Sequence, residues 1–177
     1  MFSKLYYWQT AGFLFTSAFG VILHFLYDWT NQNRFVALFS GVNESTWEHM
    51  KILFFPLFIF SLIQYCSFKD YSPFFCVKLK GILFGLILIP VIFYTLTGIF
   101  GELYDWVNIG IYFVSALAVF VFETMLFKNT NNIKSGGICF VLILIIAVIF
   151  MVFTFFPPKI PLFLDMQENF YGIKKTP

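Results

Sequence analysis

The sequence predicts an all-α fold, a polytopic membrane bundle of five transmembrane helices, and three observations support this prediction. Of the 177 residues, 60% are hydrophobic and only 11% are charged, against about 45–50% and about 25% in average soluble chains. Five long stretches contain no Asp, Glu, Lys or Arg, and a spanning helix needs about 20 mostly apolar residues. The 28 phenylalanines follow no repeat period, which excludes fibrous and solenoid classes. A soluble domain and a disordered chain are excluded as well.

The charge-free stretches predict helices rather than strands. Irregular backbone cannot satisfy its hydrogen bonds in lipid, and the strands of a membrane barrel alternate polar and apolar residues. We expect one transmembrane domain over residues 1–177, with helices over about 7–28, 46–67, 80–100, 106–127 and 137–156. A short interfacial segment is expected around Arg34 to Val42. Residues 157–177 are expected to lie across the membrane surface, with their apolar side chains either at the interface or folded over the polar residues, because three prolines forbid a regular helix.

Lysines gather on one side of the predicted bundle. Five helices place the N-terminus on the same side as the loops around residues 67–80 and 128–136. This side has the single acidic residue Asp70, and its basic residues are Lys4, Lys69, Lys78, Lys80, Lys128 and Lys134. Basic residues in short loops favour the cytoplasm. We therefore expect a plasma-membrane protein with a cytoplasmic N-terminus and a C-terminus outside.

Two further expectations concern the predicted cytoplasmic side. Cys66, Cys76 and Cys139 all fall there, and because thiols stay reduced in the cytosol we expect no structural disulfide. Glu123 lies inside the fourth predicted helix, within reach of the flexible side chain of Lys128. We expect a structural ion pair between these two residues.

Ionisable residues gather at the outer ends of the predicted helices. His24 and Asp28 are four residues apart and therefore share one helix face. If the stretch from Asn43 to Lys51 is helical from about Ser45, one stripe holds Glu44, Glu48 and Lys51, and His49 is turned about 100° away from Glu48. We expect these side chains to form an ion or ligand site, composed of His24, Asp28, Asn43, Glu44, Glu48, His49 and Lys51.

Part of this cluster is a candidate metal site. Neutral imidazoles beside carboxylates are ligands for zinc, iron or manganese, and the candidate ligands of such a divalent metal are His24, Glu44, Glu48 and His49. Their spacing matches no standard metal motif, and the same groups can form a proton relay or a polar clamp between helices. Ser45-Thr46-Trp47-Glu48 also matches the capping box of a helix start, which gives Glu48 a structural alternative.

Three stretches resemble a family of small bacterial multi-pass membrane proteins that has no assigned function. They are residues 24–29, residues 36–51, and Pro157 to Phe163 together with residues 171–173. The run Asn-Glu-Ser-x-Trp-Glu-His-x-Lys, from Asn43 to Lys51, is the most specific part. The resemblance extends over essentially the whole chain and implies a bacterial plasma membrane. It implies no substrate, cofactor, reaction or catalytic residue.

Three functions are consistent with this sequence. The first is binding or transport of an ion or small molecule at an outward-facing site made by His24, Glu44, Glu48 and His49. The second is a membrane-embedded metal enzyme acting on a lipid-like substrate, in which one carboxylate helps the imidazoles to hold the metal and another moves protons. The third is an accessory subunit with a structural polar network.

The expected partners follow from the composition and the length. The lipid bilayer is the first partner. A homo-oligomer or another membrane protein is the second, because 177 residues leave a monomer little room for a permeation path. A net charge of +2 is too small for a nucleic-acid partner.

Overall fold

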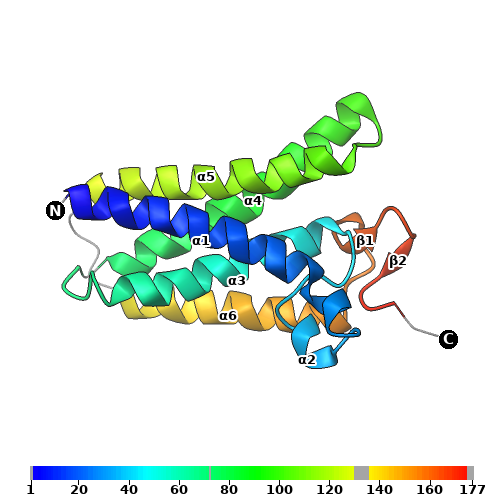
Figure 1. Cartoon of the computed structure of the whole chain (residues 1–177), viewed down its shortest axis with the longest axis horizontal. Coiled ribbons are helices and arrows are strands. Elements are labelled where there is room, and N and C mark those ends of the chain that lie inside the picture. Colours follow the sequence, from blue (N-terminus) through cyan, green and yellow to red (C-terminus); the bar gives the residue numbers. More distant parts are fainter. Residues whose placement is uncertain (1, 72, 130–135, 175–177) are drawn as a thin grey trace.

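The chain has five long helices, which run side by side along the length of the molecule (Figure 1). The computed structural model describes residues 2–71, 73–129 and 136–174, so Lys134 and the last residues of the predicted tail lie outside it. The long helices are α1 (Phe2–Trp29), α3 (Thr46–Tyr65), α4 (Phe74–Phe100), α5 (Asp105–Asn129) and α6 (Gly136–Phe155). All five are long and apolar enough to cross a membrane. The predicted all-α membrane bundle is confirmed.

Helices α1 and α4 begin before the predicted residues 7 and 80. The prediction started each helix close to its charge-free stretch, but α1 also includes Lys4, and α4 also includes Lys78. Lys4 donates a hydrogen bond to the Ser67 carbonyl oxygen at 3.0 Å, and Lys78 forms an ion pair inside the bundle. A lysine whose ammonium group finds a partner does not end a membrane helix.

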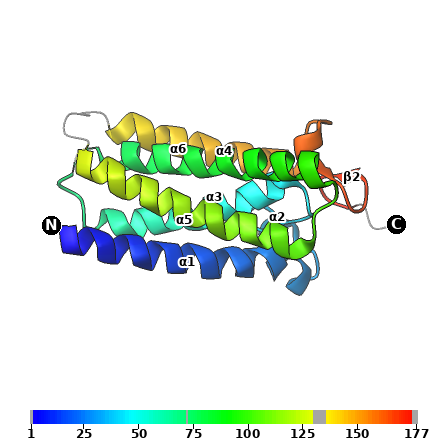
Figure 2. The same cartoon turned by 90° about the horizontal axis from the view of Figure 1, so that it is seen from above.

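Helix α3 is the central helix. Of its most apolar 18-residue window, 67% is buried, against 22% for α1, α4 and α6. Helix α1 packs against α3 and α5, and α4 packs against α3, α5 and α6. Figure 2 shows α4 and α6 along one side of the bundle and α1 along the other. Large apolar side chains remain exposed along α1, α4, α5 and α6, and this is the surface that a bilayer would cover.

The connection between α1 and α3 and the segment after α6 fold over the C-terminal end of the bundle (Figure 1). Helix α2 (Arg34–Ala37) lies in the connection from α1 to α3. After α6 come a 3-10 turn, η1 (Pro161–Phe163), and two short strands, β1 (Leu164–Asp165) and β2 (Phe170–Tyr171), which pair antiparallel with Asp165 opposite Phe170. The ring of Phe163 lies 4.5 Å, between centroids, from that of Trp47 at the start of α3. This contact joins the tail to the central helix.

A disulfide between Cys76 and Cys139 joins the first turns of α4 and α6 at the N-terminal end of the bundle, where the two Cα atoms are 5.0 Å apart. The prediction of no structural disulfide was therefore wrong. That prediction rested only on the reducing conditions of the cytosol. The sequence alone does not show that α4 and α6 begin next to one another. Cys66 is free and exposed.

The disulfide leads to a count of reactive thiols. In protein unfolded with detergent but without reductant, we expect a maleimide–polyethylene glycol reagent to modify only Cys66, and reduction should make all three cysteines reactive. Gel electrophoresis resolves each added polymer. The Cys66→Ser variant is the control, and it should remain unmodified until reductant is added. Modification of all three thiols without reductant would show that the bond does not form.

Candidate functional site

The loop between α2 and α3 carries Glu44 to the end of α1. Its Gly41 backbone N–H donates to the Leu23 carbonyl oxygen at 3.1 Å, beside His24. The Glu44 backbone N–H donates to Asp165 Oδ2 of the tail at 3.0 Å. The loop is therefore fixed both to α1 and to the segment that follows α6.

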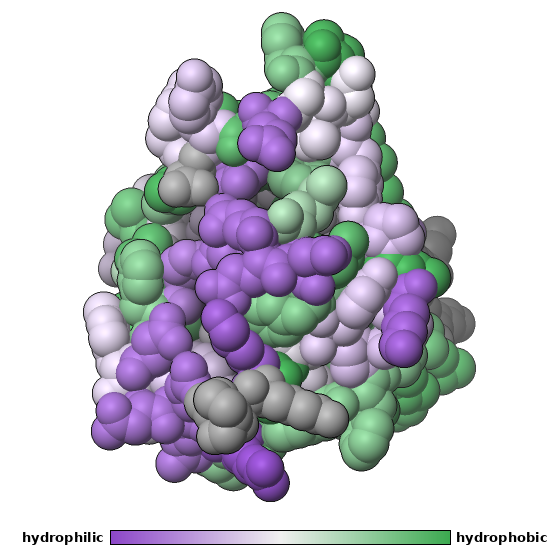
Figure 3. Space-filling model, turned by 90° about the vertical axis from the view of Figure 1, so that its right-hand side faces the viewer, coloured by the Kyte–Doolittle hydropathy of each residue, from purple (hydrophilic) through white to green (hydrophobic). Residues whose placement is uncertain are grey.

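Three side chains from three segments converge at this point. His24 Nε2 lies 3.6 Å from Glu44 Oε1, and His49 Nε2 lies 3.6 Å from Glu44 Oε2. One candidate ligand atom from each of the three residues lies within 4.8 Å of the other two. We call His24, Glu44 and His49 the His–Glu–His site. It lies at the C-terminal end of the bundle, where hydrophilic residues gather on the end face (Figure 3).

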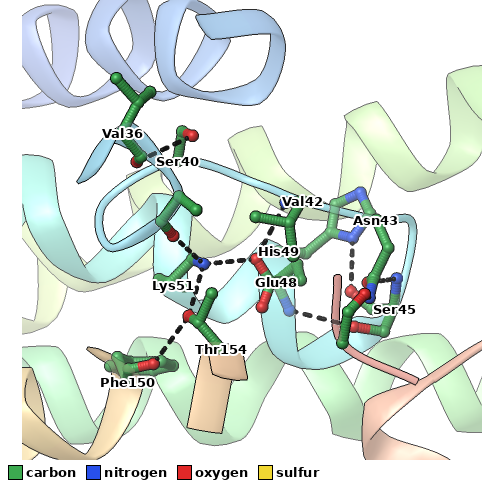
Figure 4. Close-up of polar contacts among 12 residues, drawn as sticks. Val36, Ser40, Val42, Asn43, Ser45, Glu48, His49, Lys51, Phe150 and Thr154 are labelled. Carbon is green, nitrogen blue, oxygen red and sulfur yellow. Dashed lines mark hydrogen bonds and ion pairs between the residues drawn. The ribbon is translucent and has the colours of Figure 1, made fainter. Parts of the chain in front are cut away.

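A hydrogen bond sets the orientation of the His49 ring. His49 Nδ1 lies 2.9 Å from the Ser45 carbonyl oxygen (Figure 4). A carbonyl oxygen only accepts, so Nδ1 carries the hydrogen in the neutral ring and Nε2 keeps its lone pair. Histidines that bind a metal through one ring nitrogen commonly donate a hydrogen bond from the N–H of the other in this way. The Nε2 lone pair of His49 is thus free on the side where Glu44 lies.

The distances fit a small transition-metal ion. Zinc binds nitrogen and oxygen ligands at about 2.0–2.2 Å, which places ligand atoms of a tetrahedral site about 3.3 Å apart. The two histidine–carboxylate distances of 3.6 Å are close to that separation, but they end on different oxygens of Glu44, and three ligand atoms taken one per residue lie up to 4.8 Å apart. Two imidazoles and a carboxylate leave one position open, as catalytic zinc sites do. The three side chains can therefore hold a metal with small adjustments of their rotamers.

The site is open toward α4 and α5. A chamber of about 20 Å³ is lined by Glu44 and His49 together with Asn108 and Tyr112 of α5, and this volume holds about one water molecule. A larger cavity of about 340 Å³ shares Glu44 and Asn108 with the chamber and continues to Gln167 of the tail. The sequence analysis missed Asn108 and Tyr112, although a spacing of four in an apolar helix places both polar groups on one face.

Glu48 and Lys51 turn into the bundle, away from the two histidines. Glu48 Oε2 lies 2.5 Å from Lys51 Nζ, and the two side chains are 2% and 0% exposed. Lys51 Nζ also donates to the Ala37 carbonyl oxygen and to Thr154 Oγ1 at 2.9 Å each, and Glu48 Oε2 accepts from the Val42 N–H at 3.1 Å (Figure 4). This buried pair joins α2, the loop, α3 and α6. The structure does not bring Glu48 to the candidate metal ligands.

The start of α3 explains why the expected stripe of Glu44, Glu48 and Lys51 does not form. Helix α3 begins at Thr46 after the cap residue Ser45, so Glu44 lies before the helix and points elsewhere. Ser45 Oγ accepts from the Glu48 N–H at 3.4 Å, as the capping box predicts. The Glu48 carboxylate does not complete the box, because the Ser45 N–H donates to Asn43 Oδ1 at 2.9 Å.

The other expected site residues lie outside the His–Glu–His site. Asn43 Nδ2 donates to the Gly172 carbonyl oxygen at 2.9 Å, so Asn43 joins the loop to the tail. Asp28 is exposed near the end of α1. Neither group reaches the place where the three candidate ligand atoms meet.

A second buried ion pair lies toward the N-terminal end of the bundle. Lys78 Nζ of α4 lies 2.6 Å from Glu123 Oε2 of α5, and the two side chains are 2% and 1% exposed. The expected pair of Glu123 with Lys128 was therefore wrong. Lys128 donates instead to the Tyr6 hydroxyl. Because α4 begins earlier than predicted, Lys78 stands one turn inside the helix, directly across from Glu123.

The similarity to known proteins extends over nearly the whole chain. A family model described as a family of unknown function (DUF6512) matches residues 1–173, which include all five long helices and nearly all of the described tail. No curated protein and no solved structure matches the chain.

The buried pair at the start of α3 gives a stability prediction. Lys51→Met leaves the Glu48 carboxylate buried without its cation, and breaking such a pair from one side costs about 3–5 kcal/mol. We expect the free energy of unfolding, measured by denaturant titration with circular dichroism, to fall by that amount. Lys159→Met, which removes an exposed lysine at the same end of the bundle, is the control and should change it little.

A second variant separates charge from packing. Glu48→Leu combined with Lys51→Met removes both charges, and replacing a whole buried pair by apolar residues is often neutral. The double variant should therefore recover much of the lost stability. A Lys51→Met protein as stable as the unmodified chain would contradict the structural role of the pair.

Proposed function

The chain belongs to a family of unknown function, DUF6512, and we propose that it is a membrane protein that binds a divalent transition-metal ion at His24, Glu44 and His49. One observation carries this proposal. Side chains from α1, from the loop before α3 and from α3 itself bring three ligand atoms within 4.8 Å of one another.

The dimensions of the chamber favour an ion over an organic ligand. Its volume of about 20 Å³ admits one water-sized particle. Imidazole and carboxylate ligands together suit zinc, iron and manganese, and zinc accepts the four-coordinate arrangement that this site offers. The Glu44 side chain is 40% exposed, so an ion can enter from solvent. All three ligands come from one chain, so binding needs no second copy.

We place the site at the outer face of the plasma membrane. Lys4, Lys69, Lys80 and Lys128 lie at the N-terminal end of the bundle, and basic residues near the ends of membrane helices favour the cytoplasm. The disulfide between Cys76 and Cys139 lies at that same end, and disulfides are typical of oxidising compartments. The two indicators favour opposite orientations, and we base our proposal on the lysines.

A metal-dependent enzyme acting on a lipid-like substrate is the second candidate. The observation in its favour is the cavity of about 340 Å³ beside Glu44, which is lined by Phe93, Leu103 and Met166 and also by the carboxylate of Glu102. A metal with an open position can activate water there, and Glu102 can move protons. Zinc-dependent hydrolysis of a fluorescent phospholipid in reconstituted protein would favour this candidate over binding alone.

The metal proposal predicts zinc binding that depends on three residues. The detergent-purified chain should bind about one zinc ion per molecule, as a site with two imidazoles and a carboxylate would. His24→Ala, His49→Ala and Glu44→Gln should each raise the dissociation constant by at least about 100-fold. Loss of a residue that only hydrogen-bonds to a metal ligand already lowers metal affinity by about 10–100-fold. Isothermal titration calorimetry measures both quantities.

The matched control is Asp28→Asn. It removes an exposed carboxylate one helical turn from His24, and the dissociation constant should change far less than in the three ligand variants. If the double variant His24→Ala/His49→Ala bound zinc as tightly as the unmodified chain, the site would lie elsewhere and this proposal would fail.

The proposed orientation predicts which cysteines a membrane-impermeant maleimide reaches. Cys66 is free and exposed at the N-terminal end of the bundle, so it should react only after the cells are permeabilised. A cysteine introduced by Lys159→Cys lies at the opposite end and should react in intact cells. The reverse pattern would place the N-terminus outside and the His–Glu–His site at the cytoplasmic face.

A further inference from the structure

A second cavity at the C-terminal end of the bundle is a groove of about 650 Å³. It lies where the ends of α1 and α6, helix α2 and the tail meet (Figure 1). None of the three candidate metal ligands lines it. Its volume is typical of sites that bind small molecules. We call it the basic groove, after Arg34 and Lys174, which line it together with Gln32, Phe155 and Phe156.

Two cations from distant parts of the chain give the basic groove its charge. Arg34 is the only arginine of the chain, and no hydrogen bond or ion pair joins its guanidinium group to another described residue. Lys174 forms an ion pair with Glu168, and both side chains are more than half exposed. An ammonium group has three N–H donors, so Lys174 can bind a further acceptor and keep Glu168. The groove is therefore suited to an anion.

A strained turn between α1 and α2 brings Gln32 and Arg34 to the groove. Asn31 and Gln32 have φ angles of 51° and 58°, in the left-handed region that residues with side chains rarely adopt. The Gln32 N–H donates to the Tyr27 carbonyl oxygen at 2.9 Å and so closes the turn. Backbone strain of this kind clusters at functional positions such as ligand clamps. Here the strained residue Gln32 itself lines the groove.

Apolar side chains form another wall of the basic groove. Phe155 ends α6 and Phe156 follows it, and both rings are exposed. Trp29 and Phe35, on either side of the strained turn, are exposed as well. Aromatic side chains gather where membrane helices reach the headgroup level of a bilayer. The groove thus joins two cations to a surface that lipid chains would cover.

We propose that the basic groove binds the headgroup of one anionic phospholipid, with the phosphate at Arg34 and Lys174 and the lipid chains along Phe155 and Phe156. A guanidinium group can bind two phosphate oxygens at once, and basic pockets between membrane helices bind anionic headgroups. Among the described residues that line the groove, none carries a carboxylate, so the ammonium group of a zwitterionic lipid finds no partner. A free phosphate ion would leave the apolar wall uncovered.

The bound lipid would connect the tail to α2. Tyr171 and Ile173 line the groove, and between them stands Gly172, whose carbonyl oxygen accepts the hydrogen bond of Asn43. The lipid would therefore stabilise the tail in its place over the end of the bundle. This role needs no metal and extends beyond the proposed function.

The test is native mass spectrometry of the full chain in detergent with a metal chelator, titrated with phosphatidylglycerol or phosphatidylethanolamine. We expect one phosphatidylglycerol molecule per chain, bound at least about tenfold more tightly than phosphatidylethanolamine. Arg34→Gln and Lys174→Gln should each weaken phosphatidylglycerol binding by about tenfold or more, since each removes a hydrogen bond to a charged group. Millimolar inorganic phosphate should not displace the lipid.

The matched control is Lys159→Gln. It removes an exposed lysine at the same end of the bundle that does not line the groove, and phosphatidylglycerol binding should change far less. Arg34 is exposed, so the circular dichroism spectrum of Arg34→Gln without added lipid should match that of the unmodified chain.

Three results would each overturn the proposal. The first is equal binding of the two lipids, and the second is an equal effect of Lys159→Gln and Arg34→Gln, which would indicate attraction to the surface as a whole. The third is displacement of the lipid by inorganic phosphate, which would make the groove a site for the free ion. The chelator keeps these outcomes separate from that of the zinc experiment.

Discussion

The buried ion pair between Glu48 and Lys51 is the interaction on which the C-terminal end of the bundle depends. A buried charge must be paired and hydrogen-bonded, and the partners here come from α2, the following loop, α3 and α6. The Glu48 carboxylate binds the Val42 N–H, two residues before Glu44, and His49 follows Glu48 directly. The pair therefore holds in place the backbone that presents two of the three candidate metal ligands. Burying the two charges requires desolvation, and in return the pair fixes the backbone that positions Glu44 and His49 before any ion binds.

The ion pair also separates two carboxylates that look alike in the sequence. The sequence spacing of Glu44 and Glu48 corresponds to one helical turn, but α3 begins between them at Thr46. Glu48 is thereby turned inward to Lys51, while Glu44 stays half-exposed in the loop, between the two histidines. The tail contributes to this separation, because Asp165 and Gly172 hold the backbone of Glu44 and the side chain of Asn43.

Much of the fold could be predicted from the sequence, because a helix that crosses a lipid bilayer needs a long apolar stretch, and such stretches are visible in the sequence. Five charge-free stretches predicted five helices. The side on which each residue falls predicted that His24, Glu44 and His49 would lie together, but it also placed Glu48 with them, and the structure turns Glu48 inward to Lys51. Pairings across helices could not be predicted, since they depend on rotation and on where each helix starts. The pairing of Glu123 with Lys78 rather than Lys128 is one example, and the disulfide between the starts of α4 and α6 is another. The spacing of Asn108 and Tyr112 was visible in the sequence, but only the structure places both beside Glu44 and His49.

The most direct measurement of the metal site is X-ray absorption at the zinc edge of the zinc-loaded chain. We expect scattering from two imidazole rings together with oxygen, since His24 and His49 both offer Nε2 toward Glu44. His49→Ala should retain one imidazole, and His24→Ala likewise. A spectrum without imidazole scattering, or one that stays the same when both histidines are replaced, would contradict the account.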